Sequence, residues 1–308
     1  MARKHKFSDF KIWCSEIHSL LSIPKGIKPK QQQYKKYERL LNSEKEKSDE
    51  DVEYILDMQK KIAVLNNPPL SQTTINALLR QYGWKTYNKK VAATSDPLSF
   101  MKKGSDMEIE AVELLSTIDN QQYRLEVDTV ENEHIIGRCD VLCQDTDLVI
   151  DTKISWNVNS FLKARTSQVS KKHWYQMQGY MELYNVNHAE IVFLLLNTPP
   201  ELIEREKIKL QNKFMIGEID REKYELDMEN IESAFTYSNI PLNKRCFRYR
   251  VKREPQVFDA IYKKVEKSRI WMRDFEKSMK TVIFDVPSEN YIGNTEENNT
   301  ESDTPDTD

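Results

Sequence analysis

Two stretches of the sequence carry acidic side chains that neighbouring strands could bring together. Asp140 follows an apolar stretch, and eleven residues later Asp151 and Lys153 lie within another. Because alternate residues of a strand share a face, Asp151 and Lys153 are predicted to lie side by side, with Ile150 and Thr152 on the opposite face. If the two stretches pair across a short turn, Asp140 arrives beside Asp151.

A group of carboxylates of this kind could bind a divalent cation. Two carboxylates about 4 Å apart repel by about 4 kcal/mol at an effective dielectric constant of about 20. A third acid nearby would add to this repulsion, and one lysine does not neutralise three acids. Ligands that are all oxygen favour Mg²⁺ or Mn²⁺ over zinc. The alternative is an exposed ion pair between Asp151 and Lys153 on an edge strand, which would contribute little to stability.

A third acid lies near the start of a helix predicted to open at Gly104. Glu108 follows this glycine by four residues and Ser105 by three. The spacing from Ser105 to Glu108 also fits a capping box, in which the glutamate only binds the start of the helix. Glu108 and Glu110 flank the apolar face of the helix on opposite sides, and the periodicity does not choose between them.

A later predicted helix carries polar residues on one face. Gln176 and Tyr180 are four residues apart and therefore share a face. Gly179 lies between them, and a glycine inside a helix costs about 1 kcal/mol relative to alanine, which predicts close packing against a neighbouring backbone. The chain has only seven glycines, so Gly104 and Gly137 are also predicted to lie where other groups approach the backbone. A core helix with incidental polar residues is the alternative.

Taken in order, these motifs resemble those of a known enzyme family. The motifs are Gly-x-x-x-Glu at 104–108, Gly-x-x-Asp at 137–140, Asp-x-Lys at 151–153 and Gln-x-x-x-Tyr at 176–180. Over about residues 98–200 they resemble the PD-(D/E)XK nuclease superfamily, and within it the lambda-exonuclease-like, YqaJ-type phage recombination nucleases. Cys139 departs from the proline usual before the aspartate, and Asp151 lies where many relatives have glutamate. Neither change removes a suitable metal ligand.

The resemblance implies a metal site. It assigns Glu108 to this site, because the helix acid of the family lies four residues after the glycine. Asp140, Asp151 and the backbone carbonyl of Thr152 would hold one or two Mg²⁺ ions, and Glu108 would complete or bridge the ligand shell.

The other implied roles concern water and DNA. Lys153 would position the attacking water or stabilise the charged phosphate. Gln176 would orient the nucleophile or the DNA backbone, and Tyr180 would support it. Lys163 and Arg165 follow the catalytic strand and are candidates for phosphate contacts, with simple solvent exposure as an equally good interpretation.

The predicted fold class is α+β (α/β). Strands are predicted at 123–130, 133–143 and 148–154, as a three-stranded antiparallel meander, and at 191–196 and 245–251. Helices are predicted at 7–21, 51–65, 71–82, from 104, at 171–184, within 200–236 and at 256–280. Together with the resemblance, these elements indicate a central mixed sheet of about five strands flanked by helices, a restriction-endonuclease-like core with a helical N-terminal region and a C-terminal helix.

Three regions are predicted along the chain. Residues 1–97 form a mainly helical N-terminal region, residues 98–286 form the nuclease core with its C-terminal helical extension, and residues 287–308 form a disordered acidic tail. The tail holds seven acids and no Lys or Arg, so residues 1–286 carry a net charge of +4. Ten Lys or Arg against three acids in the first forty residues are compatible with a polyanionic partner. An ordinary solvated surface explains these charges equally well.

Composition and pattern exclude several other classes. The longest apolar run, Ile191–Leu196, has six residues, whereas a membrane-spanning helix needs about 20. The first residues contain no apolar export segment, so we expect a cytoplasmic protein of a bacterium or a phage-infected cell. The four cysteines form no C-x-x-C pair and are predicted to be reduced packing residues. Since only Cys246 lies downstream of the core, a RecB-like nuclease with an iron–sulfur cluster is disfavoured.

The expected function is a Mg²⁺-dependent deoxyribonuclease, in which Mn²⁺ could replace Mg²⁺. The resemblance implies an exonuclease on double-stranded DNA ends in phage recombination or replication. It also suggests a homo-oligomer and a single-strand-annealing or single-strand-binding recombination protein as partners. One alternative is a structure- or site-specific endonuclease on the same core. The alternative of another class is a non-catalytic nucleic-acid-binding or scaffold protein, which is disfavoured because every charged motif position keeps a competent residue type.

Overall fold

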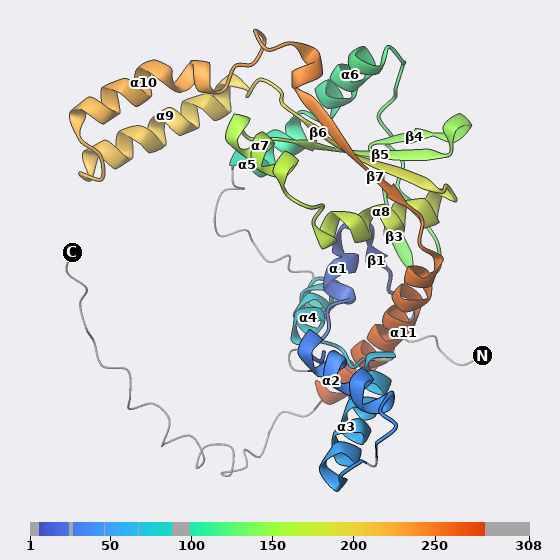
Figure 1. Ribbon diagram of the computed structural model, residues 1–308. Helices are drawn as coiled ribbons and strands as arrows, with labels where there is room; N and C mark the ends of the chain where they lie inside the picture. Colours follow the sequence, from blue (N-terminus) through green and yellow to red (C-terminus); the bar gives the residue numbers. More distant parts are fainter. Residues whose placement is uncertain (1–5, 25–26, 46, 67, 88–98, 281–308) are drawn as a thin grey trace, which may run out of the picture.

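The strands of this protein are divided between two sheets. The computed structural model describes residues 6–24, 27–45, 47–66, 68–87 and 99–280. The larger sheet has the strand order β4-β5-β6-β7 and the smaller sheet the order β1-β3-β2. Helices cover both faces of the larger sheet, and α2, α3, α4 and α11 lie together at one end of the molecule (Figure 1). The predicted mixed α/β class is confirmed, with the expected strands distributed over these two sheets.

The elements of the described chain have the following bounds. The strands are β1 (Ile12–Trp13), β2 (Val130–Glu131), β3 (Ile135–Gly137), β4 (Val141–Cys143), β5 (Leu148–Ile154), β6 (His188–Leu194) and β7 (Cys246–Lys252). The helices of the first half are α1 (Ile17–Leu20), α2 (Gln31–Leu41), α3 (Asp49–Asn66), α4 (Gln72–Tyr87), α5 (Ser99–Asp106) and α6 (Glu108–Asp119). Those of the second half are α7 (Val158–Thr166), α8 (Lys171–Tyr184), α9 (Pro200–Met215), α10 (Arg221–Ala234) and α11 (Pro255–Ser278).

Strand β5 is central in the larger sheet. It pairs antiparallel with β4 and parallel with β6, where Asp151 lies opposite Ile191. Its alternate residues enter different cores, because Val149 packs in the core that includes α8 and Ile150 packs in the core that includes α6. The predicted alternation is therefore confirmed, and it places Asp151 and Lys153 on the face of the sheet that α8 covers.

The three-stranded meander predicted over residues 123–154 is wrong. Its last hairpin, β4 with β5, is present, but β3 belongs to the smaller sheet and pairs parallel with β1. Residues 123–129 form no strand. The chain leaves the smaller sheet at Gly137, where an added β-carbon would lie 2.8 Å from the Cys14 sulfur and 2.9 Å from the Tyr180 ring. Packing against the N-terminal segment and α8 therefore holds β3 apart from β4.

The helix predicted over residues 7–21 is also wrong. The segment forms β1, a 3₁₀ turn at Cys14–Glu16 and the short α1. The backbone N–H of Ile12 donates to the carbonyl of His134 at 3.0 Å, so strand pairing overrides the helical spacing of the apolar residues. The helix predicted to open at Gly104 is two helices, because Gly104 lies within α5 and α6 begins at Glu108. The other predicted helices and strands are confirmed with shifted ends, and the region 200–236 forms α9 and α10.

Two of the three glycine predictions are confirmed. An added β-carbon at Gly179 would lie 2.6 Å from Ile17 and 2.7 Å from the Cys14 sulfur, so both Gly137 and Gly179 allow α8 and β3 to approach the N-terminal segment. The groups that approach are side chains rather than backbone. The space around Gly104 is open, so the prediction of a close approach there is wrong.

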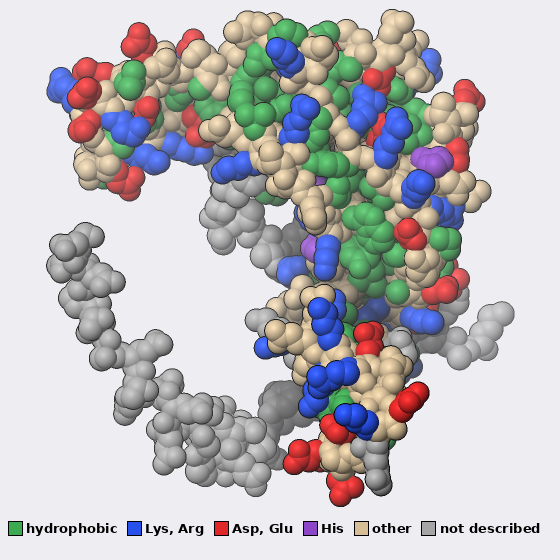
Figure 2. Space-filling view, viewed as in Figure 1, with side chains coloured by type: hydrophobic (Ala, Val, Ile, Leu, Met, Phe, Trp, Pro, Cys, Tyr) green, Lys and Arg blue, Asp and Glu red, His purple; other side chains and the backbone are tan. Residues whose placement is uncertain are grey.

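Helices α9 and α10 form a hairpin that projects away from the sheets (Figure 1). Ile203, Ile231 and Phe235 pack between the two helices. Lys207 forms ion pairs with Glu204 and Glu232, and side chains of both charge signs are interspersed over this arm (Figure 2). Such a surface is typical of solvated helices.

Some predictions of the sequence analysis concern the ends of the regions. The boundary predicted after residue 97 and the acidic tail predicted over residues 287–308 lie outside the described residues. No helix in the described ranges combines the length and the apolar character that a membrane crossing requires. All four cysteines are free thiols, as predicted, and Cys14 and Cys139 are buried in the core.

Candidate active site

One cavity unites the residues that four separate motifs predicted. It has a volume of about 590 Å³ and opens between α5, α6, β5 and α8. The predicted residues that line it are Glu108, Asp140, Asp151, Thr152, Lys153, Gln176 and Tyr180. Trp13, Met101 and Arg138 also line it and were not predicted. The predicted residues, which are up to 72 positions apart in the chain, therefore share one solvent-accessible pocket.

The centre of the site is the pair of Asp151 and Lys153 on β5. The Asp151 side chain is 3% exposed and forms an ion pair with Lys153. Burial opposes the charge on Lys153, but the Asp151 and Asp140 carboxylates outweigh it and raise the pKa of the lysine, so its amine stays protonated. Because β5 is a central strand and Asp151 is buried, the interpretation as an exposed ion pair on an edge strand is wrong.

Helix α8 supplies the residues that orient Asp151. The side-chain amide of Gln176 donates to Asp151 Oδ1 at 3.2 Å and to the Tyr180 hydroxyl oxygen at 2.9 Å. Burial raises the pKa of Tyr180, so its hydroxyl stays neutral and can accept this hydrogen bond. Asp151 Oδ2 is buried, and it is the oxygen that forms the ion pair with the amine of Lys153.

Asp140 occupies the place where β4 leaves β5. Its backbone N–H donates to the Ile150 carbonyl at 3.2 Å, and its Oδ2 accepts hydrogen bonds from the Thr152 N–H and hydroxyl, both at 2.6 Å. The carboxylate thus replaces the backbone acceptor that a longer β4 would offer. Burial, followed by the nearby Asp151 charge, raises the pKa of Asp140 to about 6.

Glu108 is the first residue of α6 and faces the same cavity. The predicted capping box is absent, because the Ser105 hydroxyl donates to the Lys102 carbonyl and Glu108 Oε2 accepts from Arg138 Nη2 at 2.8 Å. Burial and the Asp140 charge raise the pKa of Glu108 against the opposing effect of Arg138. Arg138 directly follows Gly137 of the second motif, but an arginine at this position does not by itself predict a contact with Glu108.

The donor set of the cavity suits a hard divalent cation. Glu108, Asp140 and Asp151, which we call the cavity acids, offer carboxylate oxygens. Such ligands fit Mg²⁺ or Mn²⁺ rather than zinc. The three carboxylates are not all within 4.8 Å of one another, and Arg138, Thr152, Gln176 and Lys153 are their partners.

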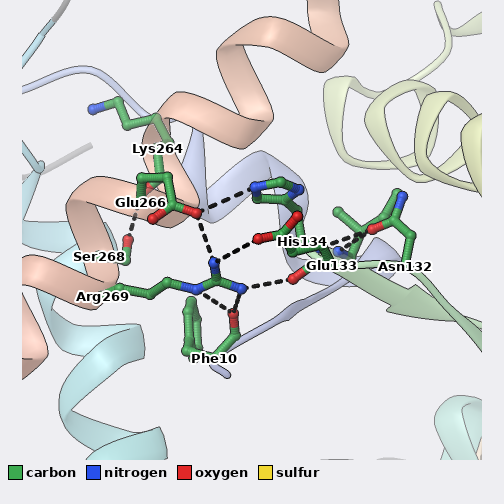
Figure 3. Close-up of polar contacts among 9 residues, drawn as sticks. Phe10, Asn132, Glu133, His134, Lys264, Glu266, Ser268 and Arg269 are labelled. Carbon is green, nitrogen blue, oxygen red and sulfur yellow. Dashed lines mark hydrogen bonds and ion pairs between the residues drawn. The ribbon is translucent and has the colours of Figure 1, made fainter. Parts of the chain in front are cut away.

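A tighter group of potential ligands lies elsewhere, between β3 and α11. In the described part of the chain, one group of three possible metal ligands has all its ligand atoms within 4.8 Å of one another: Glu133, His134 and Glu266. We call this group the surface cluster. Figure 3 shows Arg269 among them, with its guanidinium 2.6 Å from Glu266 Oε1. Arg269 also donates to the Phe10 carbonyl at 2.9 Å. A protein cation therefore already balances these acids and joins α11 to the N-terminal segment.

Lys103 was not predicted, and it is completely buried beside the cavity. From α5 it donates to the carbonyls of Ser155 at 3.1 Å, Trp156 at 3.2 Å and Leu196 at 2.7 Å, which lie just beyond the carboxyl ends of β5 and β6. Its amine also lies 5.5 Å from the centre of the Tyr237 ring. Burial lowers the pKa of Lys103 to about 7. No sequence pattern marks this contact, because its acceptors come from distant segments.

Two predicted DNA contacts lie outside the cavity. Lys163 and Arg165 are exposed on the last turn of α7, and neither lines the pocket of the cavity acids. Their position follows the carboxyl end of β5, as the sequence indicated.

Comparison with solved structures finds a similar fold in two exonucleases. A phage-related exonuclease from Haemophilus somnus 129PT superposes with a TM-score of 0.61 at 20% sequence identity, covering 88% of this chain and 97% of that one. The chain has the fold of that exonuclease. LHK-Exo, an alkaline exonuclease from Laribacter hongkongensis solved in complex with dAMP, superposes with a TM-score of 0.50 at 11% identity, covering 89% of this chain and 94% of that one. The resemblance to lambda-exonuclease-like nucleases is thus confirmed at the level of the fold.

Comparisons at the level of sequence give no match. No protein-family model matches the chain, and no curated protein does. The similarity to exonucleases therefore rests on the three-dimensional fold. The proposed roles of individual residues rest on the geometry of the cavity.

Proposed function

We propose that this protein is a Mg²⁺-dependent deoxyribonuclease that acts as an exonuclease on double-stranded DNA ends. The observation that carries the proposal is the convergence of four sequence motifs on one cavity, centred on the buried Asp151 and Lys153 of β5. The fold shared with a phage-related exonuclease supports the same class. Recombination or replication of phage DNA is the process that this fold suggests.

The cavity acids would hold the metal ion. Glu108, Asp140 and Asp151 offer the oxygen ligands that Mg²⁺ prefers, and Mn²⁺ fits the same donors. The predicted carbonyl ligand of Thr152 belongs to this proposal as well. When bound, the metal would lower the pKa of a coordinated water and stabilise negative charge on the phosphate.

The amine and amide groups would act on water and phosphate. Lys153 keeps its proton because the acids raise its pKa, so it suits stabilisation of the phosphate oxyanion better than proton abstraction. Gln176 donates to Asp151 and to Tyr180 together, which supports a positioning role for both of these α8 residues. Arg138 lies beside Glu108 and could bind a phosphate oxygen.

A scaffold protein is a weaker interpretation of these residues. Asp140 is buried close to the Asp151 charge and its pKa is raised, and keeping two carboxylates together in this way is unfavourable for stability. Such unfavourable groups gather at functional sites in proteins. A homo-oligomer, a recombination partner that anneals or binds single strands, and a cytoplasmic location are further parts of the proposal.

A digestion assay tests the proposed function. Linear duplex DNA and covalently closed circular duplex DNA are incubated with the protein in Mg²⁺, in Mn²⁺ and in EDTA. We expect loss of the linear DNA with either metal, intact circles, and no reaction in EDTA. Nicking of the circles would favour the endonuclease. If no DNA is cleaved with either metal, the proposal is wrong and the binding-protein interpretation is favoured.

A further inference from the structure

The connection between β5 and β6 has an uneven charge pattern. Residues 152–181 contain five Lys or Arg and no Asp or Glu, in a chain with 49 acids among 308 residues. Four of these cations lie on α7 and α8, outside the cavity, and we call them the crossover patch: Lys163, Arg165, Lys171 and Lys172. All four are exposed, and none is joined to an acid by an ion pair within the described residues.

The two cations of α7 are not needed to complete their helix. Lys and Arg near a helix C-terminus often bind its last carbonyl groups. Here hydroxyl groups bind the carbonyls of residues 162–165 instead. The Thr166 hydroxyl binds the carbonyls of Leu162 and Lys163, and the Ser167 hydroxyl lies 2.7 Å from the Lys163 carbonyl. The Tyr249 hydroxyl from β7 lies 2.9 and 3.2 Å from the last two. The cationic groups therefore remain available to solvent on a helix end that β7 holds in place.

The two cations of α8 lie where a helix does not favour them. Lys171 and Lys172 occupy its first two positions, where the macrodipole disfavours each cation by about 0.3–1 kcal/mol. Ser170 already caps this end by accepting from the His173 N–H at 3.2 Å. Burial, and then the charges of Lys153 and Lys172, lower the pKa of His173 to about 4. Neither Lys171 nor Lys172 forms an ion pair with an acid among the described residues.

The α8 part of the crossover patch lies near the candidate active site, and the α7 part lies on the same β5–β6 connection. Strands β5 and β6 are parallel, so their connection starts at the carboxyl end of β5, one residue beyond Lys153. Lys172 lies one helical turn before Gln176, which lines the cavity. In sheets of this kind ligands bind beyond the carboxyl ends of parallel strands. A polyanion with one phosphate in the cavity can therefore reach α7 and α8 with its next phosphates.

We infer that the crossover patch binds the phosphate backbone of the DNA next to the bond that is cleaved. The inference rests on the proposed function and adds a second contact region to it. Four exposed cations on two helix ends suit a linear polyanion, because each can neutralise a separate phosphate. The contacts are independent of base sequence, since they involve phosphates only.

Equilibrium binding of a fluorescent blunt duplex, measured by anisotropy in EDTA at several KCl concentrations, tests this inference. The test variant carries Lys163→Gln, Arg165→Gln, Lys171→Gln and Lys172→Gln. The control variant removes four cations that each pair with an acid: Lys61→Gln, Lys207→Gln, Lys223→Gln and Arg273→Gln. Both variants lose the same charge, and circular dichroism checks that both are folded.

We expect the test variant to raise Kd at least about tenfold and to reduce the slope of log Kd against log[KCl] by about three to four. The control variant should stay within about threefold of wild type. Equal losses in both variants, or an unchanged slope in the test variant, would overturn the inference while leaving the nuclease proposal intact. Wild-type affinity of the test variant for DNA, with cleavage by the wild-type protein, would also overturn the inference and leave the nuclease proposal intact. A wild-type protein that neither binds nor cleaves DNA would overturn both proposals.

Discussion

Two groups of acidic side chains in this molecule differ in what surrounds them. The surface cluster has its donor atoms within 4.8 Å of one another, and Arg269 neutralises it. The cavity acids are more spread out, but they line a pocket of about 590 Å³. Closeness of carboxylates therefore does not by itself identify a reactive site.

Burial separates the two groups more clearly. In the surface cluster the side chains of Glu133 and Glu266 are 77% and 50% exposed, so water solvates their charges. In the cavity the Asp151 side chain is 3% exposed, and the pKa of Asp140 is raised by burial and by Asp151. Buried carboxylates beside one another destabilise a fold unless a cation joins them. The comparison teaches that acids kept where they are unfavourable are the better candidates for chemistry.

The largest expected effect that tests this comparison is on catalysis. Asp151→Ala removes a proposed metal ligand and the partner of Lys153, so we expect kcat/KM on linear duplex DNA to fall by about 10³-fold or more. Lys153→Ala should cause a loss of similar order. The matched control is Glu266→Ala, which should stay within about twofold of wild type. Retained activity in the Asp151 variant, or an equal loss in the Glu266 variant, would reverse the assignment of the two groups.

A smaller effect should distinguish the surface cluster as a structural one. Arg269 is 11% exposed and donates to the carbonyls of Phe10 at 2.9 Å and Glu133 at 2.6 Å. Arg269→Met leaves these acceptors unpaired, so we expect the free energy of unfolding in urea to fall by about 2–3 kcal/mol. Turnover per folded molecule should be unchanged. A loss of turnover without a loss of stability would show that this cluster takes part in the reaction.

The smallest effect concerns the pH dependence of stability in EDTA. The pKa of Asp140 is raised from 3.8 to about 6 in the folded state, because the folded protein holds the proton more tightly. This proton binding stabilises the folded state fully below pH 3.8, and the stabilisation is lost as pH rises through 6. Asp140→Asn does not titrate, and it should therefore gain about 1–2 kcal/mol relative to wild type between pH 4 and pH 7.5. Urea unfolding at both pH values measures the difference. A difference between Asp140→Asn and wild type that is the same at both pH values would show that the folded-state pKa of Asp140 is not raised.

Local sequence rules predicted the centre of the site. The alternation of β5 placed Asp151 and Lys153 on one face and Ile150 on the other, because successive side chains of a strand point in opposite directions. The four-residue spacing of Gln176 and Tyr180 likewise predicted that they share a helix face, and they are hydrogen-bonded to each other. Motif order predicted the fold class, which the structural comparison confirms.

Contacts between distant segments decided the rest. Pairing of β1 with β3 replaced the helix predicted over residues 7–21 and separated β3 from β4, because the backbone groups of those strands found partners far along the chain. The choice between a helix cap and a site residue at Glu108 depended on Arg138, thirty residues away. Lys103 gave no signal, since a buried lysine is recognised only by the carbonyls around it. Periodicity fixes which way a side chain points within its own element, whereas its partner is set by how the elements pack.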